Sequence, residues 1–181
     1  MTCAAVLKKL RALGNAENVA GMARFGIHTT KALGVSVPDL RTLAKKLGCN
    51  HALALQLWDS DVHEARVLAA FIGSPLELTE AEMERIVLEI DSWDICDQLC
   101  GEFFNRHPLA YQKAVAWSRR EEEFVKRAGF VLMARLAVHD KKADNTAFLA
   151  FLPLIERESI DVRNMVKKRS TGRCVKSANA T

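Results

Sequence analysis

Apolar residues recur along the chain at spacings of three and four, which is the period of a helix that buries one face. No sustained stretch alternates apolar and polar residues as a half-buried strand would. The pattern therefore predicts an all-α protein whose short amphipathic helices cover one another's apolar faces. The predicted helices lie in Val6–Leu13, Leu40–Leu47, Leu53–Trp58, Ala65–Ile72, Met83–Ile90, Ile95–Phe104, Ala110–Trp117, Phe124–Val138 and Phe148–Ile155.

Residues that begin or end helices stand between these stretches. Thr79 and Glu82 have the spacing of a capping box, and Pro38 and Pro108 suit the first turn of a helix. Gly48 suits a helix end. Serial helix pairs of about 40 residues are typical of HEAT-like repeats, which would form a curved α-solenoid. Periodicity alone fits a compact helical bundle equally well.

Length and composition are those of one soluble domain. The chain has 181 residues, of which 49% are hydrophobic and 27% charged. No segment approaches the roughly 18 apolar residues that a membrane span needs, and no signal peptide is expected at the start. The five cysteines are odd in number and scattered, which argues against a disulfide framework and favours a cytoplasmic protein.

The net charge of +4 is weak support for a nucleic-acid partner. Three of the basic residues lie in the tail after Lys168, which contains no acidic residue. A DNA-binding protein of this composition would have to gather its basic groups on one face, and total charge does not show that.

Residues 91–98 (DSWDICDQ) contain the most informative local pattern. Ser92 or Asp91 can cap a helix, which places Trp93 and Asp97 four residues apart on one face. An aromatic ring beside a carboxylate is a suitable cradle for a cation. Spacing alone favours a plainer interpretation, in which Trp93 packs in the core and Asp97 is a surface acid.

Several segments, taken in order from about residue 5 to residue 168, resemble the DNA alkylation repair family of HEAT-like-repeat DNA glycosylases of the AlkD-like type. A set of motifs in the family's order is far more specific than any one of them. The segments are 21–27 (GMARFGI), 34–41 (GVSVPDLR), 57–59 (LWD), 63–66 (HEAR), 92–97 (SWDICD), 122–129 (EEFVKRAG), 136–141 (LAVHDK) and 162–168 (VRNMVKK).

The resemblance implies an enzyme that hydrolyses the N-glycosidic bond of N3- and N7-alkylated purines such as 3-methyladenine and 7-methylguanine. The W-D-x-x-D pattern of the family's catalytic helix matches Trp93, Asp94 and Asp97, with Asp97 and Trp93 as the catalytic residues. The family's arginine that contacts the DNA backbone matches Arg127. Asp94 and Lys126, in the same two motifs, are expected to bind DNA with it. The expected partner is double-stranded DNA with alkylated bases, bound by a monomer without metal or cofactor.

Two other interpretations of the residues stay open. A non-catalytic helical-repeat scaffold that binds DNA or protein would have the same fold. Cys96 and Cys100 lie one turn apart, but without two further ligands at zinc spacing they are better explained as buried thiols. Trp58 and Trp117 are expected to pack in the core, and His63–Glu64 is expected to be a capping or surface pair.

The resemblance ends at Lys168, so we predict one domain over residues 1–168 and a disordered tail over 169–181. Family members continue with a helix resembling AVNWALRQIGKRN, whose tryptophan forms a second aromatic wall of the lesion site. Codons can be chosen for that helix so that dropping the first base yields the whole observed tail. We therefore predict a one-base frameshift after Lys168 and weak or absent activity in this chain. The coding DNA beyond the Lys168 codon tests the idea.

Overall fold

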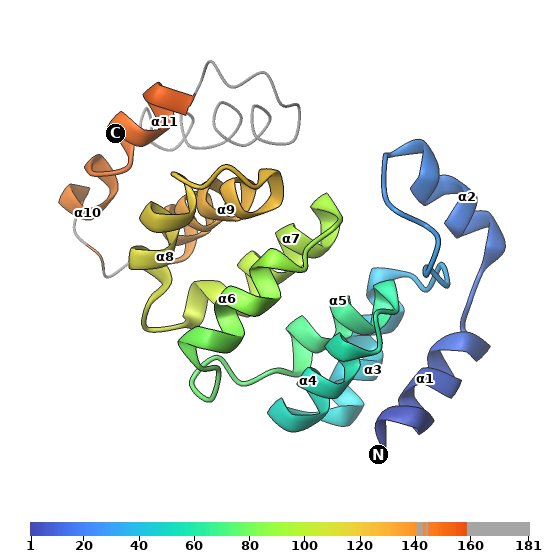
Figure 1. Cartoon of the computed structure of the whole chain (residues 1–181). Helices are drawn as coiled ribbons and strands as arrows, with labels where there is room; N and C mark the ends of the chain where they lie inside the picture. Colours follow the sequence, from blue (N-terminus) through green and yellow to red (C-terminus); the bar gives the residue numbers. More distant parts are fainter. Residues whose placement is uncertain (141–142, 144, 159–181) are drawn as a thin grey trace. The chain divides into compact units, whose positions relative to one another are not determined.

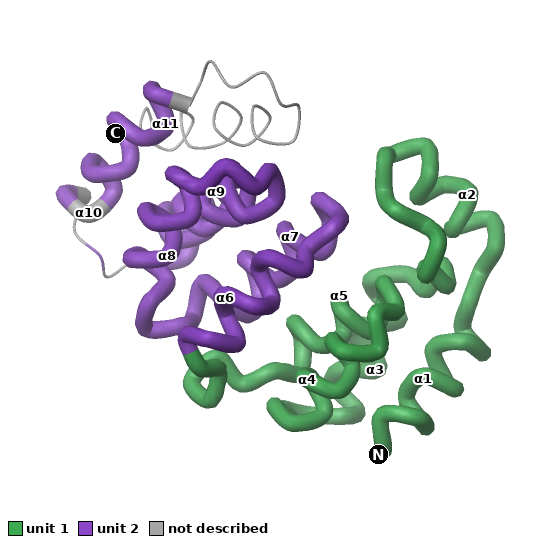
Figure 2. Tube along the Cα trace, in the orientation of Figure 1, with its two compact units in different colours: residues 1–79 green, residues 80–181 purple. Residues whose placement is uncertain are grey.

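The computed structural model describes residues 1–140, 143 and 145–158, and each regular element within them is helical. The chain folds as two compact units, Met1–Thr79 (unit 1) and Glu80–Thr181 (unit 2), which Figure 2 draws in different colours. None of the described helices is long and apolar enough to cross a membrane. The all-α prediction is confirmed. The single domain over residues 1–168 stays a prediction, and the predicted tail lies outside the described residues.

The helices of unit 1 are α1 (Cys3–Ala12), α2 (Ala16–Arg24), α3 (Val37–Leu47), α4 (His51–Asp59) and α5 (His63–Ile72) (Figure 1). Helix α5 is buried on almost every side, because α3, α4 and α1 all pack against it. Helix α1 contributes Val6 and Leu10 to this core, and both side chains are fully buried. The core of unit 1 is therefore formed around one central helix.

The carboxylate of Glu64, on α5, fixes the loop that precedes α3. It accepts hydrogen bonds from the backbone N–H groups of Leu33, at 2.8 Å, and Gly34, at 2.6 Å. Gly34 has a φ of +78°, and a Cβ there would lie 2.0 Å from the carbonyl oxygen of Asn15. Because Glu64 is only 1% exposed, its interpretation as part of a surface pair is wrong.

The elements of unit 2 are α6 (Glu80–Leu88), α7 (Trp93–Glu102), the 3-10 helix η1 (Phe104–Arg106), α8 (Ala110–Trp117), α9 (Glu123–His139), α10 (Asn145–Leu149) and α11 (Leu152–Glu158). Helix α9 lies at the centre and packs on α6, α7 and α8. The Sγ atom of Cys96 meets the Phe124 carbonyl at 3.8 Å, and that of Cys100 meets the Ala128 carbonyl at 3.6 Å. Successive turns of α7 thus meet successive turns of α9, so the two helices run parallel.

Two elements differ from the periodicity. Helix α2 was not predicted, although Val19 and Met22 recur within it at helical spacing; none of its residues is buried. The single helix predicted over Phe148–Ile155 is wrong, because the structure has α10 and α11 with a break between them. Pro153 explains the break, since its ring would clash with the carbonyl four residues earlier in a continuous helix. In α11 it occupies the first turn, where proline is tolerated.

Candidate functional site

The candidate site begins at the first turn of α7. Ser92 is the N-cap residue with an extended backbone, and its hydroxyl donates a hydrogen bond to the Asp94 carboxylate. The helix then carries Trp93 and Asp97 one turn apart on one face, as their spacing predicts. Asp97 is 7% exposed and Trp93 is half-buried, so neither a surface acid nor a fully packed core tryptophan describes them.

The buried carboxylate of Asp97 forms an ion pair with Arg127 of α9. The guanidinium Nη2 donates to Asp97 Oδ1 at 2.9 Å, and Arg127 is 3% exposed. Such a charge-assisted hydrogen bond is stronger than a neutral one, and burial reduces its screening by salt. The structure thus brings together two residues that the sequence resemblance assigned to separate tasks.

The same guanidinium lies near the ring of Trp93. Arg127 Cζ is 5.9 Å from the ring centroid, within the range of a cation–π interaction. The aromatic and acidic cradle predicted for a cation is therefore occupied here by a cation of the protein itself. A cationic ligand near Asp97 would act beside Arg127, and a phosphate could compete with Asp97 for the guanidinium.

The other two predicted DNA-binding residues are placed differently. Asp94 is half-buried at the start of α7, beside Ser92. Lys126 is 5% exposed and lies one residue before Arg127, so the two side chains leave α9 about 100° apart. Of the predicted set, the described contacts bring Trp93, Asp97 and Arg127 into one cluster.

Burial also shifts pKa values within this cluster and beside it. It lowers the pKa of Arg127, although the neighbouring thiols partly oppose that effect. The pKa of Cys100 is raised well above its ordinary value, first by burial and then by its hydrogen bond with Cys96. Both thiols are buried, as predicted, and the described residues contain no cluster of three potential metal ligands.

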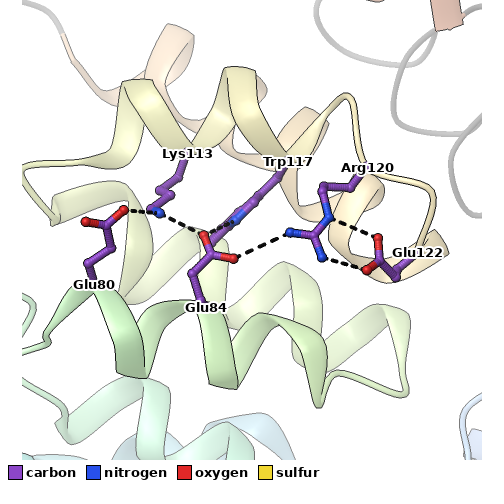
Figure 3. Close-up of polar contacts among 6 residues, drawn as sticks. All are labelled: Glu80, Glu84, Lys113, Trp117, Arg120 and Glu122. Atoms are coloured by element: carbon purple, nitrogen blue, oxygen red, sulfur yellow. Dashed lines mark hydrogen bonds and ion pairs between the residues drawn. The ribbon is translucent and has the colours of Figure 1, made fainter.

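A polar network on α6 and α8 was not predicted from the sequence. The ammonium of Lys113, 5% exposed, bridges the carboxylates of Glu80 at 2.6 Å and Glu84 at 2.7 Å (Figure 3). Glu84 also accepts from the indole N–H of Trp117 at 2.8 Å and pairs with Arg120. Arg120 in turn binds Glu122 in the turn before α9, at 2.6 Å. The network ties α6 and α8 to the start of the helix that carries Arg127.

The two remaining tryptophans pack in the cores of their units, which confirms the prediction for both. Trp58 and Trp117 are each 1% exposed. The guanidinium of Arg66 lies 4.7 Å from the Trp58 ring centroid, and Phe104 meets Trp117 edge to face at 5.5 Å. Neither ring is available to stack on a nucleic-acid base.

The network predicts an acid-sensitive contribution from Glu84. Burial raises the pKa of this carboxyl, but hydrogen bonds from Lys113 and Trp117 outweigh it and lower the pKa below the ordinary value of 4.5. A carboxyl whose pKa is lowered in the folded state stabilises the protein at any pH above its ordinary pKa. This stabilisation is lost as the pH falls through the lowered pKa. We expect Glu84→Gln to lower the melting temperature at pH 7. The difference in melting temperature between this variant and the wild type should become smaller below about pH 4.5.

The matched control is Glu89→Gln, because Glu89 forms an exposed ion pair with Arg85. Such pairs contribute little, so its melting temperature should follow the wild type at every pH. Thermal unfolding followed by circular dichroism between pH 3 and 7 measures both gaps. A gap for Glu84→Gln that does not change with pH would contradict the assignment.

The family model of the DNA alkylation repair enzymes matches residues 6–175 of the chain. The chain belongs to the DNA alkylation repair enzyme family. The match confirms the resemblance and continues past Lys168, where we had placed its end. A search of curated protein sequences finds no match for this chain.

One solved structure shares the fold over nearly the whole chain. It is described as "a new family of proteins related to the HEAT-like repeat DNA glycosylases with affinity for branched DNA structures". The TM-score is 0.87 at 19% sequence identity, and the match covers 98% of this chain and 76% of that one. At this identity the likeness shows the fold alone. The HEAT-like repeat prediction is therefore confirmed and the compact-bundle alternative is set aside.

Proposed function

We propose that this member of the DNA alkylation repair family is a DNA glycosylase that removes N3- and N7-alkylated purines from double-stranded DNA. The observation that supports this most is the cluster of Asp97, Trp93 and Arg127, which joins a carboxylate, an aromatic ring and a guanidinium on adjacent turns of α7 and α9. These are the groups that a cationic sugar and a phosphate would each require.

The proposed reaction needs little from the protein beyond electrostatic stabilisation. An alkylated N3 or N7 purine is positively charged, so it accepts the electron pair of the breaking C1′–N bond and leaves as a neutral base. The deoxyribose becomes oxocarbenium-like, and water adds to C1′ and loses a proton to restore neutrality. Asp97 would oppose the sugar's charge and position the water, while Trp93 would hold the sugar against its ring.

Arg127 would have two partners in this scheme. In the free protein its guanidinium neutralises Asp97 at 2.9 Å. A DNA phosphate would draw the guanidinium toward itself and leave Asp97 free to act on the sugar. DNA binding would therefore also switch on the carboxylate, and affinity would fall with rising salt.

A second candidate function is DNA binding without base excision. It is favoured by the ion pair, because a carboxylate that remains neutralised by Arg127 cannot stabilise an oxocarbenium. The related solved structure belongs to proteins described as having affinity for branched DNA. In this alternative Asp97 serves only to hold Arg127 in position.

Asp97→Asn separates the two candidates. The amide keeps an oxygen that can accept from Arg127, but it removes the negative charge. We expect release of 7-methylguanine from a duplex to fall by about 100-fold or more, the order of effect found when a stabilising group is removed. DNA affinity should be retained. The measurement is single-turnover base release, with fluorescence polarisation for affinity.

Glu102→Gln is the matched control, because it neutralises another carboxylate of the same helix outside the cluster. It should leave base release unchanged. If the chain releases no base at all, the same pair of variants is made with the family-like reading frame restored after Lys168. Release that is equal in Asp97→Asn and in its parent would favour the binding function instead.

A further inference from the structure

A second arginine of α9, Arg135, packs against a glycine of α7. The guanidinium of Arg135 lies against Gly101, where a Cβ would meet Cζ at 3.0 Å and Nε and Nη2 at 3.1 Å. Gly101 lies within α7 and has no positive φ, so its backbone does not require glycine. A glycine inside a helix costs about 1 kcal/mol relative to alanine. Here the missing side chain leaves the room that the guanidinium fills.

Arg127 has a carboxylate as its counter-charge, and Arg135 differs from it in this respect. No carboxylate in the described part of the chain pairs with Arg135, whereas Arg127 has Asp97. Arg135 is half-buried and Arg127 is 3% exposed. A partly buried guanidinium without a counter-charge favours an anion that approaches from solvent. Within the described residues, Arg135 is thus more accessible than Arg127 and less neutralised by carboxylates.

Both arginines of α9 reach toward α7. Both are close enough to the buried thiol of Cys100, on α7, for their charges to act on it. They are eight residues apart, which corresponds to about 12 Å along the helix axis. The guanidinium of Arg127 pairs with Asp97 and that of Arg135 lies against Gly101 about a turn further along α7, so each would contact a different phosphate of a nucleic-acid backbone.

We propose that Arg135, seated on Gly101, is a phosphate-binding residue through which the α7–α9 surface holds the DNA backbone. This inference rests on the DNA binding proposed above and adds a contact that does not require the Asp97–Arg127 pair to open. The guanidinium is held by its packing on α7, so little conformational freedom is lost when it meets a phosphate.

The test uses the full chain and a short fluorescent duplex without damage, with affinity measured from about 50 to 200 mM salt. Arg135→Gln should weaken binding roughly five- to tenfold and reduce the slope of log K against log salt by about 1. Gly101→Ala should weaken binding to a smaller extent, because the guanidinium has to shift by a few tenths of an ångström to make room for the new methyl group. Arg135→Lys keeps the charge and should retain most of the salt slope.

Arg85→Gln is the matched control, since it removes an exposed arginine of the same unit that pairs with Glu89. It should not change affinity or slope. If wild type binds the duplex and Arg135→Gln binds it equally with the same slope, the role of Arg135 is overturned while the proposed function stands. If wild type does not bind even at low salt, both fail. Should Arg135→Gln unfold, Arg135→Lys and Gly101→Ala decide the matter by the same two readouts.

Discussion

Replacing Arg127 by methionine is expected to lower the free energy of unfolding by about 3–5 kcal/mol, the usual cost of breaking a buried ion pair. The guanidinium is 3% exposed and donates to Asp97 at 2.9 Å, so its loss leaves a buried carboxylate without this counter-charge. Methionine fills much of the same volume, which keeps the packing loss small. Urea unfolding followed by circular dichroism measures the change.

Arg135→Met provides the matched control, because it removes an arginine of the same helix that no described carboxylate pairs with. Its cost should stay below about 1 kcal/mol. The double variant Asp97→Leu with Arg127→Met should recover much of the stability, since replacing both partners of a buried pair by apolar residues is often neutral. Equal costs for Arg127→Met and Arg135→Met would show that the pair contributes no net stability.

Gly129→Ala is expected to destabilise unit 2 by roughly 1–3 kcal/mol, as overpacking of a close contact does. A Cβ at Gly129 would lie 2.4 Å from the backbone nitrogen of Ser118 and 2.9 Å from the Ala114 carbonyl oxygen. Both are backbone atoms of the α8 region, so the two helices would have to separate. Alanine is favoured over glycine by about 1 kcal/mol in helix propensity. The cost of the clash must exceed this gain for the variant to be less stable than the wild type. Thermal unfolding of the full chain measures the sign and size.

Gly21→Ala tests the same substitution where space is open. Gly21 lies in α2, and a Cβ there would meet no atom within 4 Å. Helix propensity then acts alone, so this variant should be neutral or slightly more stable. A melting temperature raised by Gly129→Ala, as by Gly21→Ala, would contradict the close approach of α8 and α9.

Sequence pattern predicts the helices that bury a stripe and fails where burial or backbone chemistry is unusual. Helices such as α7 and α8 fall where their apolar residues recur. Helix α2, which buries none of its residues, was missed although it carried two local signals: Val19 and Met22 recur at helical spacing, and Asn15 caps its start by accepting from two backbone N–H groups. The break at Pro153 could have been predicted from the proline alone.

The candidate site was predictable only within one helix. Spacing along the chain places Trp93 and Asp97 on one face, because a helical turn is a local property. It does not show that Arg127, thirty residues further on, reaches Asp97. That contact depends on the parallel packing of α7 and α9, which periodicity does not specify. The seat of Arg135 on Gly101 was missed for the same reason, although an unexplained glycine inside α7 was a visible signal.

The burial of the two thiols of α7 affects how readily alkylating agents can modify the protein itself. Electrophiles that methylate purines also attack sulfur, and they react with the thiolate rather than the thiol. Cys96 and Cys100 are buried, and the raised pKa of Cys100 keeps it protonated. Exposed Cys49, in unit 1, is the described cysteine most open to such reagents. Among the described cysteines, methylation would therefore fall first on one outside the Asp97 cluster, and the thiols beside the candidate site would be spared.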